Sequence, residues 1–386
     1  MELSGANILM ANLLDQFQRT GIETEWILTG HNPIDDYAWM GPRLFSVHRL
    51  PPTPILAICE RQALMLEHLR EMSPCVYLPN FDFDMACIAP ALPEETAVVM
   101  IMHCDDPVYY DFVACYGQLF NAIVCVSQFV TNKLRNGHPH LTKRIVHIPF
   151  GVDAPVDLPL RHNKCDRYLN IVYCGRLTFH QKRIQDLAAI IRQCHDAHLP
   201  VRFLIAGTGA DEKAFCESIA ESLADGFVRH LGLVENTEVL NILDKADVLL
   251  ITSDFEGLPI VLLEAMSKGC IPIASKAESG IDEVVQDGEN GFLVPIGDVP
   301  SFIEALIRLI GDPSLLARLR QAAFARICSG GFTVQRAAAD YLGLFNSLPI
   351  CVRKVPIVRN GVPIVPSQYK ISTRIVNKVK ALLKVS

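Results

Sequence analysis

Two acidic residues, Glu256 and Glu264, stand at the two ends of an apolar run in the stretch EGLPIVLLEAM. Carboxylates accept hydrogen bonds from hydroxyl groups, so this pair could hold two hydroxyl-bearing parts of one ligand. The spacing alone is more typical of a buried helix with charged ends. The residues around the pair must therefore decide between the two interpretations.

Two cations, Arg176 and Lys182, follow the apolar run IVYCG and precede a helical pattern that starts near Asp186. A turn from a strand to a helix suits a diphosphate, because helix amides and cationic side chains both favour negative charge there. Lys and Arg in an exposed loop are more often solvated, so this pair is a weak signal by itself.

Glu256 follows the strand-like run ADVLLITS (246–253), and a helix is predicted to begin near Pro259 because proline is favoured at a first helical position. Glu256 then lies in the loop at the carboxyl end of the strand, while Glu264 lies two turns along the helix. Gly257 and Leu258 offer backbone amides at the helix N-terminus. A sugar and a ribose joined by a diphosphate have the shape that these groups could bind.

Apolar strand-like runs alternate with helical patterns in two blocks of the chain. In the first block, strands are predicted at 23–30, 74–80, 96–104, 122–127 and 144–150, with helices at 8–21 and 54–72. In the second, strands are predicted at 168–175, 201–209, 227–233, 246–253 and 270–275, with helices at 186–199, 211–224, 236–246 and 260–269. This rhythm predicts an α/β fold with two doubly wound, Rossmann-like domains that face each other across a cleft.

The domain boundaries follow from composition. A length of 386 residues, half of them hydrophobic, fits two compact domains. Residues 151–167 combine prolines and charges without apolar periodicity, which predicts a linker between domains at 1–150 and 168–345. Residues 346–386 form a separate basic tail.

Five segments of the second block occur in a characteristic order. They are Arg176 with Lys182, EGLPIVLLEAMSKG, PIAS, SGIDEVVQDGENGFLV (279–294) and DVPSFIEALIRLIGDP (298–313). Together they resemble the retaining glycosyltransferases of family 4, which have the GT-B fold. In the first block, SGAN, TAVVMIMHCDD, AIVCVSQFV and HIPFGVD resemble the corresponding family segments less closely.

The resemblance implies roles for the motif residues of the second block. Arg176 and Lys182 would hold the phosphates of a nucleotide-sugar donor and neutralise the leaving group. Glu264 would bond the ribose, and Glu256 would contact the transferred sugar. Further donor contacts would come from Gly257, Leu258 and Pro259.

The resemblance also implies roles in the first block and a reaction. His103 would touch the sugar near its reacting centre, and Gly5 would let the backbone approach the diphosphate from a loop. The sugar would pass to a glycan or lipid-linked acceptor with retained anomeric configuration, by attack on the front face. No metal and no cofactor are expected, because Arg176 and Lys182 take the place that a divalent ion would fill.

Other interpretations stay open. The same architecture serves nucleotide-sugar epimerases, and a catalytically silent partner subunit is a further alternative, although such a subunit would be expected to lack Arg176, Lys182 or Glu256. Asp82-Phe83-Asp84 spells the metal-binding Asp-x-Asp of other transferases, but so short a motif occurs often by chance. Asp105 and Asp106 could shape a turn or contact the acceptor. A metal site at His138-Pro139-His140 is not expected, because no Cys or acid stands at ligand spacing.

The two ends of the chain carry separate expectations. Members of the family open with an apolar strand before the glycine loop, whereas SGAN stands at residues 4–7. We therefore expect either that the chain starts too late or that the first sheet lacks its central first strand. The last 46 residues hold eight of the 35 basic residues and no acid, leaving 27 basic and 42 acidic residues before them. The body should therefore avoid nucleic acid. Residues 369–385 predict a basic amphipathic helix that either binds an anionic membrane or packs on the protein.

The 13 cysteines are odd in number and scattered, which indicates reduced thiols. We find no signal peptide and no apolar run of 18 residues, so a cytoplasmic protein is expected. Binding of the tail to an anionic leaflet would place it at the inner face of the membrane.

Overall fold

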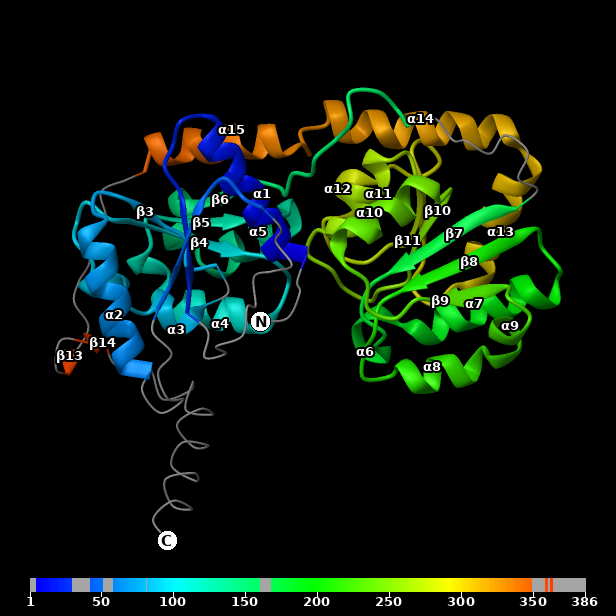
Figure 1. Cartoon of the computed structure of the whole chain (residues 1–386), viewed down its shortest axis with the longest axis horizontal. Coiled ribbons are helices and arrows are strands. Elements are labelled where there is room, and N and C mark those ends of the chain that lie inside the picture. The colour runs from blue at the N-terminus through cyan, green and yellow to red at the C-terminus, as the bar shows by residue number, and fades with distance from the viewer. Residues whose placement is uncertain are drawn as a thin grey trace, which may run out of the picture.

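The computed structural model describes residues 5–29, 42–50, 58–80, 82–159 and 168–348, together with the backbone of 358–359 and 362–363. In these parts the chain forms two α/β domains that lie side by side (Figure 1). The linker residues 160–167 and the tail helix predicted at 369–385 lie outside the described residues.

The first domain contains two parallel sheets, β1-β2 and β3-β4-β5-β6. The five strands predicted in this block are confirmed, each shorter than expected, and β2 was not predicted. Their bounds are β1 (Glu25–Leu28), β2 (Ser46–Arg49), β3 (Val76–Tyr77), β4 (Ala97–Met102), β5 (Ala122–Cys125) and β6 (Ile145–His147). The helices are α1 (Gly5–Arg19), α2 (Ile58–Glu71), α3 (Phe83–Ala86), α4 (Pro107–Tyr116) and α5 (Gln128–Gly137), with 3-10 turns η2 (Ala89–Ala91), η3 (Gly117–Leu119) and η4 (Pro139–Arg144).

Strands β4 and β5 form the core of the first domain, because their apolar side chains are buried on both faces of the sheet. His103, the residue that follows β4, therefore lies at the carboxyl end of the sheet. No strand precedes α1 among the described residues. The expectation that a central first strand is missing stays a prediction.

The second domain has one parallel sheet in the order β12-β11-β10-β7-β8-β9. Its strands are β7 (Leu169–Cys174), β8 (Val201–Ala206), β9 (Val228–His230), β10 (Val248–Ile251), β11 (Ile271–Ser275) and β12 (Phe292–Val294). The order reverses between β7 and β10, where doubly wound folds bind ligands at the carboxyl ends of the strands. The predicted doubly wound domain is confirmed.

Helices cover both faces of this sheet (Figure 1). Helix α7 shows why: its apolar residues recur at helical spacing, and Ile184, Leu187 and Ile191 are fully buried. The helices are α6 (Phe179–Lys182), α7 (Ile184–Asp196), α8 (Glu212–Ser218), α9 (Ala220–Ala224), α10 (Asn236–Lys245), α11 (Ile260–Ser267), α12 (Ile281–Val284), α13 (Val299–Gly311), α14 (Pro313–Ser329) and α15 (Val334–Asn346).

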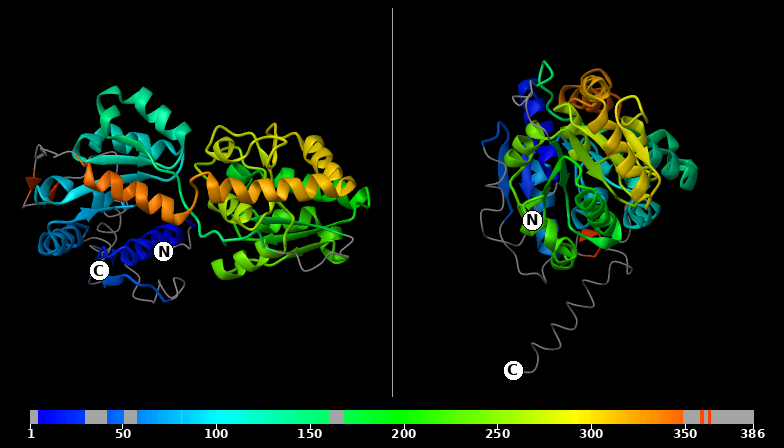
Figure 2. Two further views of the ribbon diagram at one scale, coloured as in Figure 1. Left: turned by 90° about the horizontal axis from the view of Figure 1, so that it is seen from above. Right: turned by 90° about the vertical axis from the view of Figure 1, so that its right-hand side faces the viewer.

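After α14 the chain returns to the first domain. The sequence analysis had assigned this part of the chain to the second domain, which was predicted to extend to residue 345. Figure 2 shows α14 along one domain and α15 along the other. The ring of Phe17 in α1 lies 5.8 Å from that of Phe345 and 6.5 Å from that of Tyr341 in α15. Val152 forms an isolated bridge with Thr333 just before this helix. Helix α15 therefore ties the two domains together.

Two features bear on the setting of the protein. None of the helices in the described part of the chain has both the length and the apolarity that crossing a bilayer requires. Each described cysteine is a free thiol.

The short strands β13 (Val358–Arg359) and β14 (Val362–Pro363) pair antiparallel beyond α15.

Candidate functional site

The structure joins Lys182 and Glu256 in an ion pair at the switch point of the second sheet. Lys182 ends α6 after β7, and Glu256 lies in the loop 252–259 after β10. Lys182 Nζ lies 2.5 Å from Glu256 Oε1, and Ser253 Oγ donates to the same oxygen at 2.6 Å. Only 7% of Glu256 is exposed, so these two donors compensate a carboxylate that is largely removed from water.

The backbone around Lys182 is fixed by the next residue, Arg183. Arg183 has the left-handed conformation, with φ 47°, and separates α6 from α7. Its guanidinium bonds Asp186 at 2.6 Å and Asp254 at 3.2 Å. Thr252 Oγ1 donates to the carbonyl of Lys182 at 2.7 Å. Lys182 is therefore attached to the β10 loop through its main chain and through its side chain.

Arg176 is exposed and reaches the same loop through Gln181. Arg176 Nη2 donates to Gln181 Oε1 at 2.6 Å, and Gln181 Nε2 donates to the carbonyl of Phe255 at 3.2 Å. The structure thus brings Arg176, Lys182 and Glu256 to one edge of the sheet, as predicted. Sequence reasoning missed Gln181, because an amide in a loop carries no local signal of a bridging role.

Glu264 is buried in α11, with 7% of the residue exposed. Asn236 Nδ2 in α10 donates to Glu264 Oε1 at 3.2 Å, a contact that the sequence did not predict. Burial raises the pKa of the Glu264 carboxyl above its usual range. The carboxyl therefore holds its proton more tightly in the folded chain than in the unfolded chain.

This shift predicts how Glu264→Gln changes stability with pH. The stabilisation from a raised pKa is present below the unfolded pKa of ~4.3 and is lost as the pH rises through the folded pKa. Because Gln cannot ionise, the variant escapes this loss. We expect the melting temperature of Glu264→Gln, relative to wild type, to be higher at pH 8 than at pH 5. The matched control is Glu304→Gln on the exposed face of α13. The same melting-temperature difference between Glu264→Gln and wild type at both pH values would refute the raised pKa of Glu264.

His103 follows β4 and is buried, with 6% exposed. Its ring stacks on that of Phe150 at a centroid distance of 5.6 Å. Burial lowers the pKa of His103 to about 3, so the imidazole is neutral between pH 5 and 8. A Cβ added at Gly257 would meet the His103 carbonyl oxygen at 2.4 Å and Cys104 Cα at 2.8 Å. The residue that follows Glu256 is therefore in direct contact with the first domain.

Gly5 is the first residue of α1 rather than part of a loop, which corrects the expected loop position. A Cβ at Gly5 would lie 3.0 Å from Ile260 Cδ1, so the N-terminus of α1 faces the start of α11. Pro259 caps α11, whose first helical residue is Ile260, and Leu258 is buried. The donor contacts predicted for these residues stay predictions.

Glu283 links the two domains beside this site, and sequence reasoning missed this role. Its Oε1 accepts from the backbone N–H of Gln128 at 2.5 Å and of Phe129 at 3.3 Å, at the first turn of α5. Its Oε2 lies 3.4 Å from His147 Nε2. Gly280 N also donates to the carbonyl of Gly257 at 2.5 Å. The loop that carries Glu256 is thereby fixed to the α12 region.

The competing Asp-x-Asp motif has a structural use. Asp82 caps α3 by accepting from Met85 N at 3.0 Å, and its other oxygen accepts from Thr29 Oγ1 at 2.5 Å. Burial raises the pKa of Asp84, which disfavours the charged form that a metal ligand needs. This pair is therefore poorly suited to hold a metal ion.

The two aspartates that follow Cys104 are also used within the first domain. Asp106 caps α4 through Val108 N. Asp105 bonds both Lys133 and Tyr110. Both residues therefore shape this turn, whereas an acceptor contact stays a prediction.

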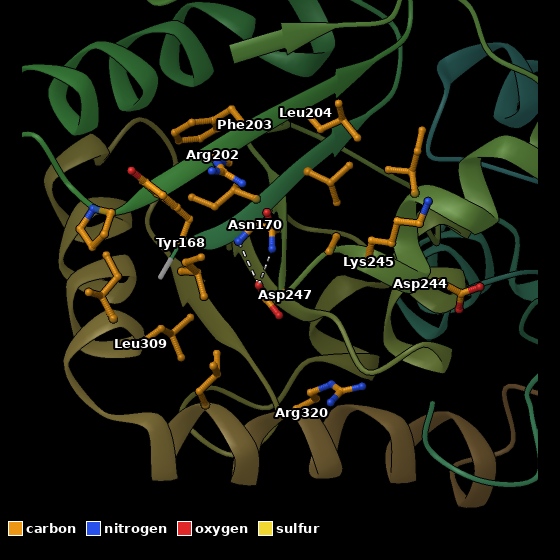
Figure 3. Close-up of a pocket in the computed structure, with 18 of the residues that line it drawn as sticks. Tyr168, Asn170, Arg202, Phe203, Leu204, Asp244, Lys245, Asp247, Leu309 and Arg320 are labelled. Atoms are coloured by element: carbon orange, nitrogen blue, oxygen red, sulfur yellow. Dashed lines mark hydrogen bonds between the residues drawn. The ribbon is translucent and has the colours of Figure 1, made fainter. Parts of the chain in front are cut away.

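A cavity of about 1020 Å³ lies away from these groups. Figure 3 shows Tyr168, Asn170, Arg202 and Asp247 around it, with Asp247 accepting from Asn170. These residues mark the amino-terminal ends of β7, β8 and β10, opposite to the end that carries Lys182 and Glu256. We assign no ligand to this cavity.

Known proteins are similar in sequence to the second domain. Residues 169–312 match the family model of Glycosyl transferases group 1. The lipopolysaccharide core biosynthesis glycosyltransferase LpsE of Rhizobium meliloti is 31% identical over 154 residues, which are 40% of this chain and 44% of LpsE. The chain spans less than half the length of the curated relatives it matches.

Solved structures match the fold over both domains. The Anabaena protein HepE in complex with UDP-glucose has a TM-score of 0.73 at 18% identity, covering 90% of this chain and 97% of HepE. The lipopolysaccharide outer core galactosyltransferase WaaB has a TM-score of 0.67 at 20% identity, covering 89% and 96%. These matches show that the chain has the predicted GT-B fold.

Proposed function

We propose that this chain, whose residues 169–312 carry the Glycosyl transferases group 1 pattern, transfers a sugar from a nucleotide-sugar donor to a glycan or glycoconjugate acceptor. The observation that carries the proposal is the grouping of Arg176, Lys182 and Glu256 at the switch point of the second sheet. Two cations and a carboxylate at the carboxyl ends of parallel strands suit a diphosphate and the sugar attached to it.

Lys182 can donate hydrogen bonds to the carboxylate of Glu256 and to a donor phosphate at the same time. Its ammonium has three donors, and Glu256 uses one of them. A donor diphosphate would take a second, while the exposed guanidinium of Arg176 would bind a further phosphate oxygen. As the bond between the sugar and the diphosphate breaks, negative charge grows on the leaving oxygen. Both cations would stabilise that charge.

His103 would act as a neutral hydrogen-bonding group beside the sugar. A pKa of about 3 keeps the ring uncharged at neutral pH, so it adds no positive charge near the reacting carbon. Its backbone contact with Gly257 places it next to the loop that carries Glu256. The two domains would therefore hold the sugar from opposite sides.

Transfer would retain the anomeric configuration and need no metal. In this mechanism the acceptor hydroxyl attacks from the face that the diphosphate leaves, and its proton passes to the departing phosphate. The protein contributes positioning and charge stabilisation. The support for metal independence is that two cationic side chains, Arg176 and the Glu256-paired Lys182, already lie at the expected phosphate position.

Glu264 would accept hydrogen bonds from the ribose of the donor. Asn236 donates to its Oε1, and the ribose would donate to Oε2. A hydrogen bond to a charged group contributes ~1.5–3 kcal/mol, so Glu264→Gln should weaken donor binding by roughly 10- to 100-fold. The stability of the same variant, relative to wild type, is expected to be higher at pH 8 than at pH 5. Opposite effects on stability and on binding would distinguish a ligand-binding role from a structural one.

The names of the relatives support glycan assembly as the setting. They include a colanic acid, an amylovoran and a lipopolysaccharide core biosynthesis glycosyltransferase. Each covers only part of this chain, so the acceptor class is inferred by similarity. We accordingly propose a polysaccharide or a lipid-linked glycan as the acceptor.

Thermal stabilisation by a panel of nucleotide sugars in the presence of EDTA tests the proposal. A ligand at 100 times its Kd should stabilise the folded chain by ~2.7 kcal/mol. We expect at least one nucleotide sugar to raise the melting temperature of wild type by more than that of Lys182→Ala. A panel without any stabilising donor would contradict the proposal. If the nucleotide sugar is converted equally well with and without an acceptor, the protein would be an epimerase instead.

We further propose that the protein works in the cytoplasm, at an anionic membrane surface bound through residues 369–385. The support is the sequence of the tail, in which each cation contributes ~1 kcal/mol near such a surface. In sedimentation with anionic liposomes, removal of residues 367–386 should release the protein into the supernatant. Unchanged sedimentation of the shortened chain would refute this role of the tail.

A further inference from the structure

Three elements of the first domain bring Glu25, His48 and His68 together. In the parallel pair β1-β2, Glu25 lies opposite Ser46, and Ile27 lies opposite His48. Side chains two residues apart on a strand share a face, so Glu25 and His48 point to the same side of this pair. Helix α2 brings His68 to that side in its last turn.

The three side chains are close enough to share one ion. His68 Nε2 lies 2.6 Å from Glu25 Oε2. The rings of His48 and His68 stack with centroids 3.9 Å apart. One possible ligand atom from each residue lies within 4.8 Å of the other two. The side chains of His68 and Glu25 are 16% and 17% exposed, so both are mostly shielded but still in contact with solvent.

Two imidazoles and one carboxylate are a donor set that Zn²⁺ takes in open, four-coordinate sites. With ligand bonds of ~2.0–2.2 Å in a tetrahedral arrangement, neighbouring donor atoms would lie about 3.4 Å apart. The His68–Glu25 pair would have to widen by less than about 1 Å, and the His48 ring would have to turn out of the stack.

We propose that Glu25, His48 and His68 bind one divalent transition-metal ion, best matched by Zn²⁺, with water in the fourth position. The ion would cross-link the two-stranded sheet β1-β2 to α2. The location of His68 in the last turn of α2 favours a cation, because the helix dipole is negative there. None of the three residues belongs to the proposed donor site, so this inference is independent of glycosyl transfer.

A second histidine pair in the same domain provides a matched control. The rings of His138 and His140 lie 6.1 Å apart in an edge-to-face arrangement. Of the described residues, only Glu25, His48 and His68 form a cluster of three metal-ligand side chains. Variants of His138 and His140 should therefore remove histidines without removing the proposed site.

Titration of the full-length chain with Zn²⁺ and with Co²⁺, under reducing conditions, tests the proposal. We expect one ion per chain, a higher melting temperature with Zn²⁺, and cobalt d–d bands without a thiolate charge-transfer band. Exposed Cys59, Cys115 and Cys328 make that spectroscopic distinction necessary. Glu25→Gln and His68→Gln should each weaken binding by on the order of 100-fold or more, because changes outside the ligand shell alone cost 10–100-fold.

The control His138→Gln/His140→Gln should bind both ions as wild type does. Wild type that binds no ion, a thiolate band in the cobalt spectrum, or unchanged affinity in Glu25→Gln would each overturn the proposal. His48→Gln should act like the other two ligand variants. If any of the variants fails to fold, the wild-type stoichiometry and cobalt spectrum still decide the outcome.

Discussion

Replacing Lys182 by Ala should lower the rate of glycosyl transfer by on the order of 100- to 1000-fold, the usual effect of removing one group that stabilises transition-state charge. Lys182 reaches the diphosphate position from α6 and neutralises Glu256 at 2.5 Å. The variant loses both interactions, so kcat should fall more than donor affinity. Initial rates of nucleoside diphosphate release at saturating donor measure this effect.

Loss of Lys182 also leaves Glu256 largely buried without its cation, which can cost about 3 kcal/mol of stability. The double variant Lys182→Ala/Glu256→Gln separates the two effects, because it removes the unpaired charge. We expect it to recover the melting temperature without recovering transfer. Lys213→Ala, in the same domain but with a side chain that is 91% exposed, is the matched control. Transfer by Lys182→Ala within about tenfold of wild type would refute the phosphate role.

Replacing Gly257 by Ala should separate the two domains at the proposed site. The added methyl group would meet backbone atoms of His103 and Cys104 at 2.4 Å and 2.8 Å, and backbone cannot move aside as a flexible side chain can. A displacement of about 1 Å at a reacting centre can lower the rate by 100-fold. We expect a loss of that size, together with a larger radius of gyration in small-angle scattering.

The matched control for Gly257→Ala is Gly343→Ala in α15, where a Cβ would meet no atom within 4 Å. This control should retain transfer and gain slightly in stability, because Ala favours a helix over Gly. The melting temperature of Gly257→Ala should fall only modestly, because the contact lies between domains and not within a core. Full activity in Gly257→Ala would show that the domains need not approach closely at this point.

The sequence was most informative for the second domain. Short apolar runs and the segments that resemble family 4 placed β7, β10 and α11, and with them Glu256 at a strand end. Weakly apolar β2 escaped prediction, because its residues SVHR lack both an apolar run and strict alternation. The return of the chain through α15 was also missed, since helical periodicity does not reveal which domain a helix packs on.

The contacts of the site itself could not be predicted. Lys182 and Glu256 were each assigned to the donor, but their ion pair joins residues 74 apart in the chain. Glu283 and Gln128 are 155 residues apart and belong to different domains. Local patterns predict which element a residue occupies, whereas such pairings depend on how complete domains pack. The same limit applies to Glu25, His48 and His68, which sequence spacing did not single out.

Release of nucleoside diphosphate from the stabilising nucleotide sugar tests the central claim most directly. It should be measured in EDTA, with a candidate glycan acceptor present and absent, and with NMR of the product to read its anomeric configuration. We predict acceptor-dependent release by wild type, retention of the donor configuration, and at least a 100-fold loss in Lys182→Ala. Release that needs a divalent metal, inverts the configuration, or survives the loss of Lys182 would contradict the proposed mechanism.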